Sequence, residues 1–206
     1  MKYKMSAFGI GLSFTMMLKS YLKTHNEDNL DIKRIAKDVK KEYKAIIKRT
    51  PDLNGNIMEG NLIGASYFFA MARVIPGMTP DRMDKLIVDV MHSKMMAMAT
   101  KKEREKGLLF SEKSHNKMIK GAEASHHSKL EYDWEFDYTP GKDEYFQTVR
   151  KCGVCKLAKQ ENLMEYLPCM CKMDYPKYEM KGAKLIRTKT LANGDDCCDF
   201  HLTRIK

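Results

Sequence analysis

Apolar residues recur at helical spacing through the first two thirds of the chain. The N-terminal segment 1–23, which carries no charge from Met5 to Leu18, predicts an amphipathic helix that packs on the core. From Asn29 to about Arg49, apolar side chains return every three or four residues among lysines, which predicts a second helix. The run from Asn56 to Val74 is apolar on most sides, and its Gly and Ala residues allow close approach of a neighbour. We therefore expect this run to form the buried central helix.

Two more helices are predicted before the pattern changes. The Thr-Pro-Asp sequence at residues 79–81 is a helix-start signal, because threonine caps, proline fits the first turn and an acid favours a helix N-terminus. The helix that it starts is predicted to continue to about Ala99. The charged run 101–106 is interpreted as a solvated helix end or connection, and a further helix is predicted for residues 111–126.

At Lys129 the period changes from helical to strand-like. Apolar and acidic residues alternate from Leu130 to Tyr138, which predicts a strand with one buried face. A turn at 139–142 and a second strand at 144–150 follow. The remaining predicted elements are helices at 155–167 and 171–175 and strands at 183–191 and 197–204.

These elements predict a single α+β domain that spans residues 1–206. The mainly helical part, 1–128, is expected to pack on one face of a small, mostly antiparallel sheet, which residues 129–206 form together with the cysteine-rich segment. The length of 206 residues and the apolar fraction of 43% fit an ordinary soluble globular protein.

The net charge of +10 changes this picture little. Residues 1–151 hold 27 Lys and Arg against 20 Asp and Glu, and residues 152–206 hold 10 against 7. Because the basic runs are interleaved with acids and no nucleic-acid-binding motif accompanies them, we interpret the charge as a solvated face that attracts small anionic substrates. No nucleic-acid partner is expected.

The predicted first helix resembles an export signal only superficially. Its apolar part is too short to span a bilayer, and no small-residue cleavage site follows it. We therefore expect a cytoplasmic protein without a membrane partner, with a signal or membrane-surface role for this helix as the lesser alternative. The sequence leaves homo-oligomerisation open.

All the cysteines lie in the last quarter of the chain, namely Cys152, Cys155, Cys169, Cys171, Cys197 and Cys198. A chain that used cysteine only as a small buried residue would scatter it, so the cluster indicates chemistry. In the cytoplasm the thiols are expected to be reduced, which disfavours a disulfide framework. One interpretation is a zinc site, the one cofactor considered, with four candidate ligands: Cys152, Cys155, Cys171 and Cys198. The CxxC pair also fits a redox role, although no thioredoxin-like βαβ pattern accompanies it.

A thiol nucleophile is the other interpretation. Cys171 and Asp174 are three residues apart, so they share a face of a helix. Cys198 and Asp199 point to opposite sides of a regular strand, and they share a pocket only if the strand starts late or bulges. Three residues are candidates for stabilising a thiolate: His201, Arg187 and Lys189. Buried packing for the cysteines and surface or capping roles for the acids are the alternative.

Three segments together resemble one known family. They read GNLIGASYFFAMARVIPGMTPDRMDKLI from residue 60, KCGVCKLAKQENLMEYLPCMCKMDY from residue 151, and RTKTLANGDDCCDF from residue 187. The combination resembles the L-2-amino-thiazoline-4-carboxylic acid hydrolase family, from about Asn56 onward. The C-terminal segments are the more specific part of the resemblance.

The resemblance implies a hydrolase that opens the ring of a cyclic thiazoline amino acid and yields an N-carbamoyl cysteine. The implied catalytic set is Cys155, Cys171, Asp174, Cys198 and Asp199. Either Cys171 or Cys198 is then the nucleophile. Either Asp174 or Asp199 is the acid or base, and Arg187 holds the carboxylate of the substrate. The substrate-binding candidates also include Trp134 and His201.

A weaker likeness gives a non-catalytic alternative. The late glycine and the Cys-x-Phe ending are similar to small-molecule-binding domains of the vinyl-reductase type. This alternative is a sensor-type module that binds a small molecule or a metal in the same cysteine pocket without turnover.

Overall fold

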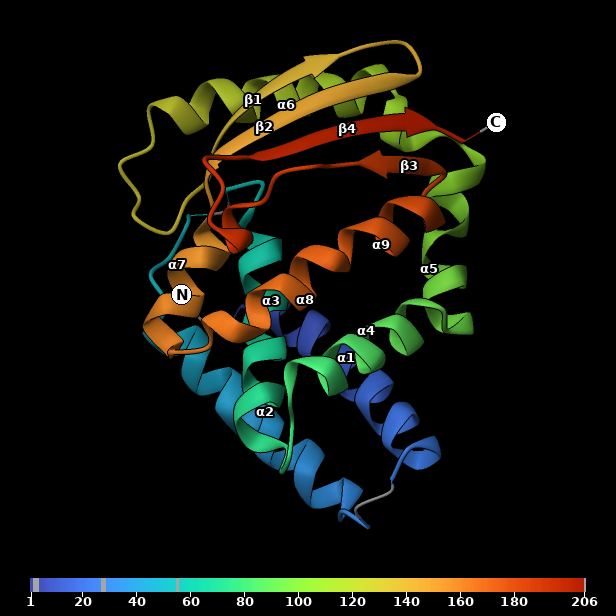
Figure 1. Cartoon of the computed structure of the whole chain (residues 1–206), viewed down its shortest axis with the longest axis vertical. Helices are drawn as coiled ribbons and strands as arrows, with labels where there is room; N and C mark the ends of the chain where they lie inside the picture. The colour runs from blue at the N-terminus through green and yellow to red at the C-terminus, as the bar shows by residue number, and fades with distance from the viewer. Residues whose placement is uncertain (2–3, 27–28, 55, 206) are drawn as a thin grey trace.

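The computed structural model describes residues 1, 4–26, 29–54 and 56–205, which form a helical part and a sheet (Figure 1). The helical part consists of α1 (Met5–Thr24), α2 (Ile32–Arg49), α3 (Glu59–Val74), α4 (Pro80–Met91), α5 (Lys94–Glu105) and α6 (Glu112–His126). Three shorter helices come later, α7 (Gly153–Glu161), α8 (Leu167–Lys172) and α9 (Asp174–Met180). Single 3₁₀ turns are η1 (Leu108–Phe110), η2 (Met164–Tyr166) and η3 (Leu191–Asn193).

The sheet has four strands in the order β1-β2-β4-β3, and each neighbouring pair is antiparallel. They are β1 (Glu135–Pro140), β2 (Glu144–Lys151), β3 (Ala183–Ile186) and β4 (Cys198–Arg204). The predicted α+β class, with a mainly helical N-terminal part and an antiparallel C-terminal sheet, is confirmed.

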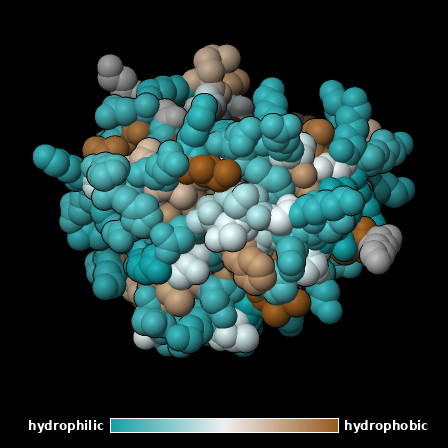
Figure 2. Space-filling model, turned by 90° about the horizontal axis from the view of Figure 1, so that it is seen from above, coloured by the Kyte–Doolittle hydropathy of each residue, from teal (hydrophilic) through white to brown (hydrophobic). Residues whose placement is uncertain are grey.

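The two faces of the sheet differ in polarity. The inner face carries buried side chains such as Val149 and Leu202 and packs on the helices. The outer face carries ion pairs, including Arg150 with Asp137. Figure 2 views the molecule from the side of the sheet and shows a mostly hydrophilic surface with scattered apolar residues. The alternation of side chains along the strands therefore separates core from solvent, as the sequence pattern predicts.

Helix α3 is the central helix, as predicted. Nine of its residues are buried: Leu62, Ile63, Ala65, Ser66, Tyr67, Phe68, Phe69, Ala70 and Met71. It packs against α1, α2 and α7. Helix α1 covers Met5–Thr24, where the sequence predicts an N-terminal helix that packs on the core. Within the described residues, no helix combines the length and apolar character of a membrane span.

Two predicted helices end earlier than expected. The helix capped by Thr79 stops at Met91 rather than near Ala99, because Ser93 caps a new helix by accepting the N–H of Met96 at 3.3 Å. The helix predicted for 155–167 stops at Glu161, because Asn162 adopts a left-handed conformation with φ of 55°. The charged run 101–106 belongs mostly to α5.

Two predicted strands are shorter than expected. The first begins at Glu135, because the buried carboxylate of Asp133 accepts the N–H of Trp134 at 2.7 Å and holds the preceding residues in a turn. The third ends at Ile186 rather than Leu191. Beyond it, the carboxylate of Asp199 accepts the N–H of Thr188 at 2.9 Å and draws the backbone out of the strand pairing.

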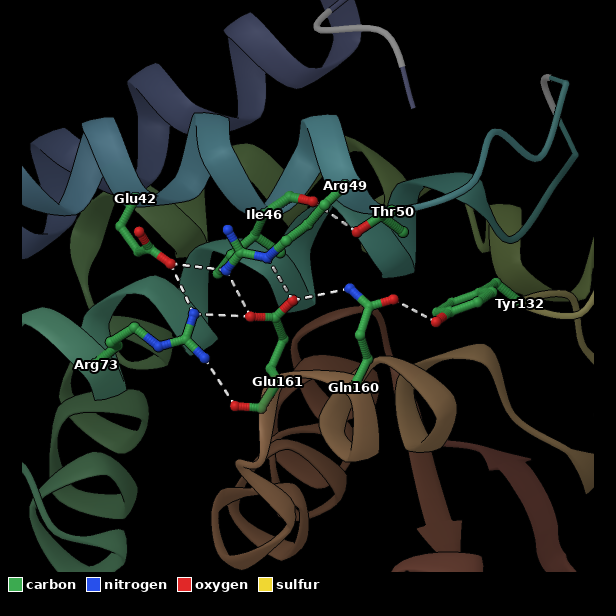
Figure 3. Close-up of polar contacts among 8 residues, drawn as sticks. All are labelled: Glu42, Ile46, Arg49, Thr50, Arg73, Tyr132, Gln160 and Glu161. Atoms are coloured by element: carbon green, nitrogen blue, oxygen red, sulfur yellow. Dashed lines mark hydrogen bonds and ion pairs between the residues drawn. The ribbon is translucent and has the colours of Figure 1, made fainter.

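A buried carboxylate joins three helices (Figure 3). The side chain of Glu161, the last residue of α7, is 2% exposed. It accepts hydrogen bonds from Arg49 of α2 at 2.8 and 2.6 Å and from Arg73 of α3 at 2.7 Å. Both arginines also donate to Glu42, and Arg73 reaches the carbonyl oxygen of Glu161 at 2.7 Å. These contacts fix α7 against α2 and α3.

The cluster is electrostatically stable at neutral pH. Burial opposes ionisation of Glu161, but hydrogen bonds from Arg49 and Arg73 outweigh it and lower the pKa of the carboxyl from 4.5 to about 2. Gln160 donates to the same carboxylate at 2.9 Å and accepts a hydrogen bond from the Tyr132 hydroxyl. The cluster thereby extends to the residues that lead into β1.

Replacing Glu161 with Gln should lower the free energy of unfolding by about 3 kcal/mol, because two arginines lose their buried partner. Since the native pKa of Glu161 lies below its unfolded value, its contribution is present above pH 4.5 and is lost as the pH falls towards about 2. Urea unfolding of both proteins, at neutral pH and along this acid range, measures the effect. The difference between the two proteins should shrink with acidification.

The matched control is Glu165→Gln, which changes an exposed glutamate of η2. Its effect should stay within about 0.5 kcal/mol at every pH. Equal losses for the two variants would contradict the structural role of the cluster.

Candidate functional site

A cavity of about 420 Å³ lies between α3 and the inner face of the sheet. Small residues of α3 leave room for it. A Cβ atom at Gly60 would meet nothing within 4 Å, and one at Gly64 would meet only Phe14 at 3.7 Å. The expectation of a closely approaching neighbour is therefore wrong at Gly60, which borders open space, whereas at Gly64 the ring of Phe14 on α1 is such a neighbour.

One cysteine of each nearby pair faces the cavity. Cys152 lies where β2 ends and α7 begins, Cys171 lies on α8, and Cys198 is the first residue of β4. Cys155, Cys169 and Cys197 do not line it. The sequence left open which cysteine of each pair faces the cavity, because the answer depends on the orientations of three separate elements.

An ion pair forms the polar wall of the cavity. Arg187, whose side chain is 2% exposed, donates from Nη1 to Asp174 at 3.0 Å and from Nη2 to the carbonyl oxygen of Cys171 at 2.7 Å. Its guanidinium lies 4.8 Å from the ring centre of Phe200 and 5.2 Å from that of Tyr175. The Nε atom is buried and has no hydrogen-bond partner among the described residues. This N–H group is therefore unsatisfied within the described part of the chain.

Asp174 organises the cations at this wall. Lys177, one turn further along α9, donates to the second carboxylate oxygen at 3.3 Å. Burial opposes the charged forms of Lys177 and Arg187, but the negative charge of Asp174 raises the pKa of both above their usual ranges. Both remain cationic at neutral pH, so the wall carries two positive charges for one negative charge.

The cavity thiols are protonated at neutral pH. Burial, assisted by the charge of Asp174, raises the pKa of Cys171 to about 12. Burial raises the pKa of Cys198 to about 11, although its sulfur accepts the N–H of Leu191 at 3.2 Å, which favours the thiolate. A hydrogen bond shared with Cys155, together with burial, raises the pKa of Cys152 well above its usual value. No histidine lines the described cavity, so thiolate formation requires a change brought by a ligand.

Five of the eight candidate site residues meet at this cavity: Cys171, Asp174, Cys198, Arg187 and Trp134. The other three, Cys155, Asp199 and His201, do not line it. His201 lies on the outer face of β4, where its Nε2 is 2.8 Å from Glu144 and its ring stacks on Phe146. For these three residues the expectation of a shared pocket is corrected, because strand alternation and the α7 helix turn them away.

The side chain of Asp199 lies on the outer face of the sheet and binds the residues that follow β3. Its carboxylate accepts the hydroxyl of Thr188 at 2.6 Å and the N–H groups of Thr188 and Lys189. It thereby fixes the residues that directly follow Arg187 and lead to the N–H of Leu191. The strand begins at Cys198 without a bulge there, so Cys198 faces inward and Asp199 outward.

Sequence reasoning missed several polar residues of the cavity: Tyr138, Tyr145, Gln147, Lys177 and Tyr178. The alternating pattern of 130–138 already placed Tyr138 on the inner face. The hydroxyl of Tyr138 lies 2.6 Å from Nδ1 of buried His115. Helical spacing from Asp174 was the signal for Lys177, since residues three apart share a face.

The arrangement gives the zinc interpretation no positive support. Across the ranges that the structure describes, no group of three or more His, Cys, Asp and Glu side chains is placed to hold a metal ion. Cys155 of the proposed ligand set lies outside the cavity that the other three share.

The family model for L-2-amino-thiazoline-4-carboxylic acid hydrolase matches residues 56–202. The chain belongs to this family. The matched segment runs from the turn before α3 into β4 and contains all the cavity residues named above except Phe14. No curated protein and no solved structure matches the chain at the significance required. Helices α1 and α2 precede the segment that this hydrolase family shares.

Gly153 is required for the turn that presents Cys152. A Cβ atom at this position would overlap the carbonyl oxygen of Tyr132 and lie 2.8 Å from Cζ3 of Trp134. We predict that Gly153→Ala destabilises the protein by about 2 kcal/mol through overpacking. Thermal unfolding measures this loss. The control is Gly60→Ala, because a Cβ atom at Gly60 meets no neighbour. Gly194→Ala is not a suitable control, because Gly194 has a positive φ. A stable Gly153→Ala protein would contradict the packing described.

Alkylation should report the raised thiol pKa values. The reaction of Cys198 with iodoacetamide should be slow at neutral pH and should rise about tenfold per pH unit until the pH approaches 11. Peptide mass spectrometry after timed labelling of the native protein measures each cysteine separately. A plateau for Cys198 below pH 8 would indicate a stabilised thiolate in the free protein and would contradict this prediction.

Proposed function

We propose that the protein is a hydrolase that opens a small cyclic thiazoline or amide-like substrate in the α3–sheet cavity. The observation that carries this proposal is the buried guanidinium of Arg187, whose Nε has no hydrogen-bond partner among the described residues, in a cavity with three inward thiols and a carboxylate. Membership of the L-2-amino-thiazoline-4-carboxylic acid hydrolase family supports the same reaction class.

Substrate binding is assigned to the cationic wall. A substrate carboxylate satisfies the free Nε donor of Arg187 and the charge of Lys177. The rings of Phe200 and Trp134 offer flat apolar surfaces beside it for a small heterocycle. An anionic substrate also balances the second positive charge of the wall, because the wall holds two cations and only one carboxylate.

Cys198 is the better placed nucleophile. The N–H of Leu191 already points at its sulfur, whereas the charge of Asp174 acts more strongly against a thiolate at Cys171. In the proposed first step, Sγ of Cys198 bonds to the ring carbon between sulfur and nitrogen, and the ring carbon–sulfur bond breaks. The thiol proton passes to the departing ring sulfur, with Asp174 as the relay.

Water completes the reaction. Its oxygen adds to the same carbon and the bond to Cys198 breaks. One proton of the water returns to the Cys198 thiolate, and the other passes to a nitrogen of the opened product. One water molecule is consumed, and a carbamoyl group remains on the nitrogen of the opened product. Because the resting thiol is protonated, the cysteine becomes nucleophilic only when a substrate occupies the cavity.

The test is turnover of L-2-amino-thiazoline-4-carboxylate by the purified, reduced protein. Mass spectrometry should detect N-carbamoyl cysteine, and a thiol reagent should report the released thiol. Cys198→Ser should lower kcat by at least about 1,000-fold, because a hydroxyl is a far weaker nucleophile here. Arg187→Lys should chiefly raise KM, because lysine lacks the planar donor set.

Controls on the outer face separate chemistry from folding. Cys197→Ser and His201→Gln change residues that do not line the cavity and should retain turnover. Loss of activity in Cys171→Ser but not in Cys198→Ser would contradict the assignment of Cys198 and would make Cys171 the nucleophile. Tight binding of the substrate without product would refute the hydrolase proposal and leave a binding module.

A further inference from the structure

One face of α1 exposes apolar side chains to solvent. Four residues at helical spacing form it, namely Met5 (83% exposed), Phe8 (44%), Leu12 (48%) and Met16 (55%). The opposite side of the helix packs into the core through Ala7, Met17 and Leu18. Exposed apolar residues are ordinary when scattered, but a continuous stripe along one helix marks an interaction surface.

Positive charge is concentrated in the part of the chain that contains α1 and α2. Residues 1–50 hold 12 Lys and Arg against 5 Asp and Glu, so they carry a net +7 of the chain's +10. The acids within α2 are already engaged, since Asp38 pairs with Arg34 at 3.8 Å and Glu42 belongs to the Glu161 cluster. Lys4 and Arg49 pair with acids outside this segment, Asp52 and Glu161, so the charge available to an external anion is smaller than this net value.

The basic and apolar residues adjoin one another. Nζ of Lys40 on α2 lies 5.8 Å from the ring centre of Phe8 on α1. Lys33 and Lys37 precede Lys40 at helical spacing, are exposed, and form no ion pair among the described residues. Lys19 continues the exposed side of α1 beyond Met16. We call this combined surface the α1–α2 face.

We propose that the α1–α2 face binds the surface of an anionic lipid membrane. An apolar stripe flanked by lysines inserts its side chains at the level of the acyl chains while the lysines contact the lipid phosphates. A second copy of this chain is the weaker occupant, because two faces of net positive charge would repel each other. The face lies at the end of the molecule away from the sheet (Figure 1).

This inference is independent of the proposed hydrolase chemistry. The face belongs to the segment that precedes the family match, and the cavity thiols lie on other elements. The expectation of no membrane partner rested on the length of the apolar run, which bears on crossing a bilayer and not on lying at its surface. Such binding would place the enzyme beside the membrane without a spanning helix.

The test is sedimentation of the full chain with vesicles. Vesicles of equimolar phosphatidylglycerol and phosphatidylcholine should bind the protein, whereas pure phosphatidylcholine vesicles should bind it far less. Added salt should weaken binding, because it screens the lysines. Leu12→Gln with Met16→Gln should lower the affinity at least about tenfold through lost apolar contact, and Lys33→Gln with Lys37→Gln should also lower it about tenfold.

Matched variants control for general effects. Val88→Gln removes an exposed apolar residue of α4, and Lys113→Gln with Lys117→Gln removes an exposed lysine pair of α6. These variants should bind as the unchanged protein does, and circular dichroism should show equal melting for all. Failure to bind the anionic vesicles, or equal losses in the control variants, would overturn the proposal. A dimer in sedimentation equilibrium that Leu12→Gln with Met16→Gln converts to a monomer would also overturn it, by assigning the face to self-association.

Discussion

The position of the cavity depends on the charge cluster around Glu161. This carboxylate ends α7 and is held by Arg49 and Arg73, so the helix that starts at Cys152 has a fixed place against α2 and α3. Burying one carboxylate is unfavourable unless cations and hydrogen bonds compensate it, and here two arginines do so. The helical part and the strand that leads to Cys152 are thereby held in fixed positions relative to each other, although they lie far apart in the sequence.

The cavity itself results from a mismatch between two faces. Helix α3 presents glycine where a central helix would usually present a large side chain, while the inner face of the sheet presents aromatic rings. The remaining space is lined by groups of different character, namely thiols, aromatic rings and the Arg187–Asp174 ion pair. This combination is the basis of the proposal that the cavity binds a small ligand with a flat ring and a negative charge.

Local patterns in the sequence predicted the class of fold, the central helix and the opposite directions of Cys198 and Asp199. They did so because hydrophobic period and strand alternation act over short distances. Element ends were less predictable, since Ser93, Asn162 and Asp199 end elements through single capping contacts. The choice of Cys152 over Cys155 and the pairing of Arg187 with Asp174 depended on how distant elements meet, which no local pattern contains.

The neighbouring residues Cys198 and Asp199 couple the two surfaces of the sheet. One side chain enters the cavity, while the other fixes the segment after Arg187 from the solvent side. The backbone that follows Arg187 is therefore fixed by a contact outside the cavity. In the proposed hydrolase, exchanges at the outer surface near Thr188 can shift this backbone, and with it the substrate preference, while every residue inside the cavity stays unchanged.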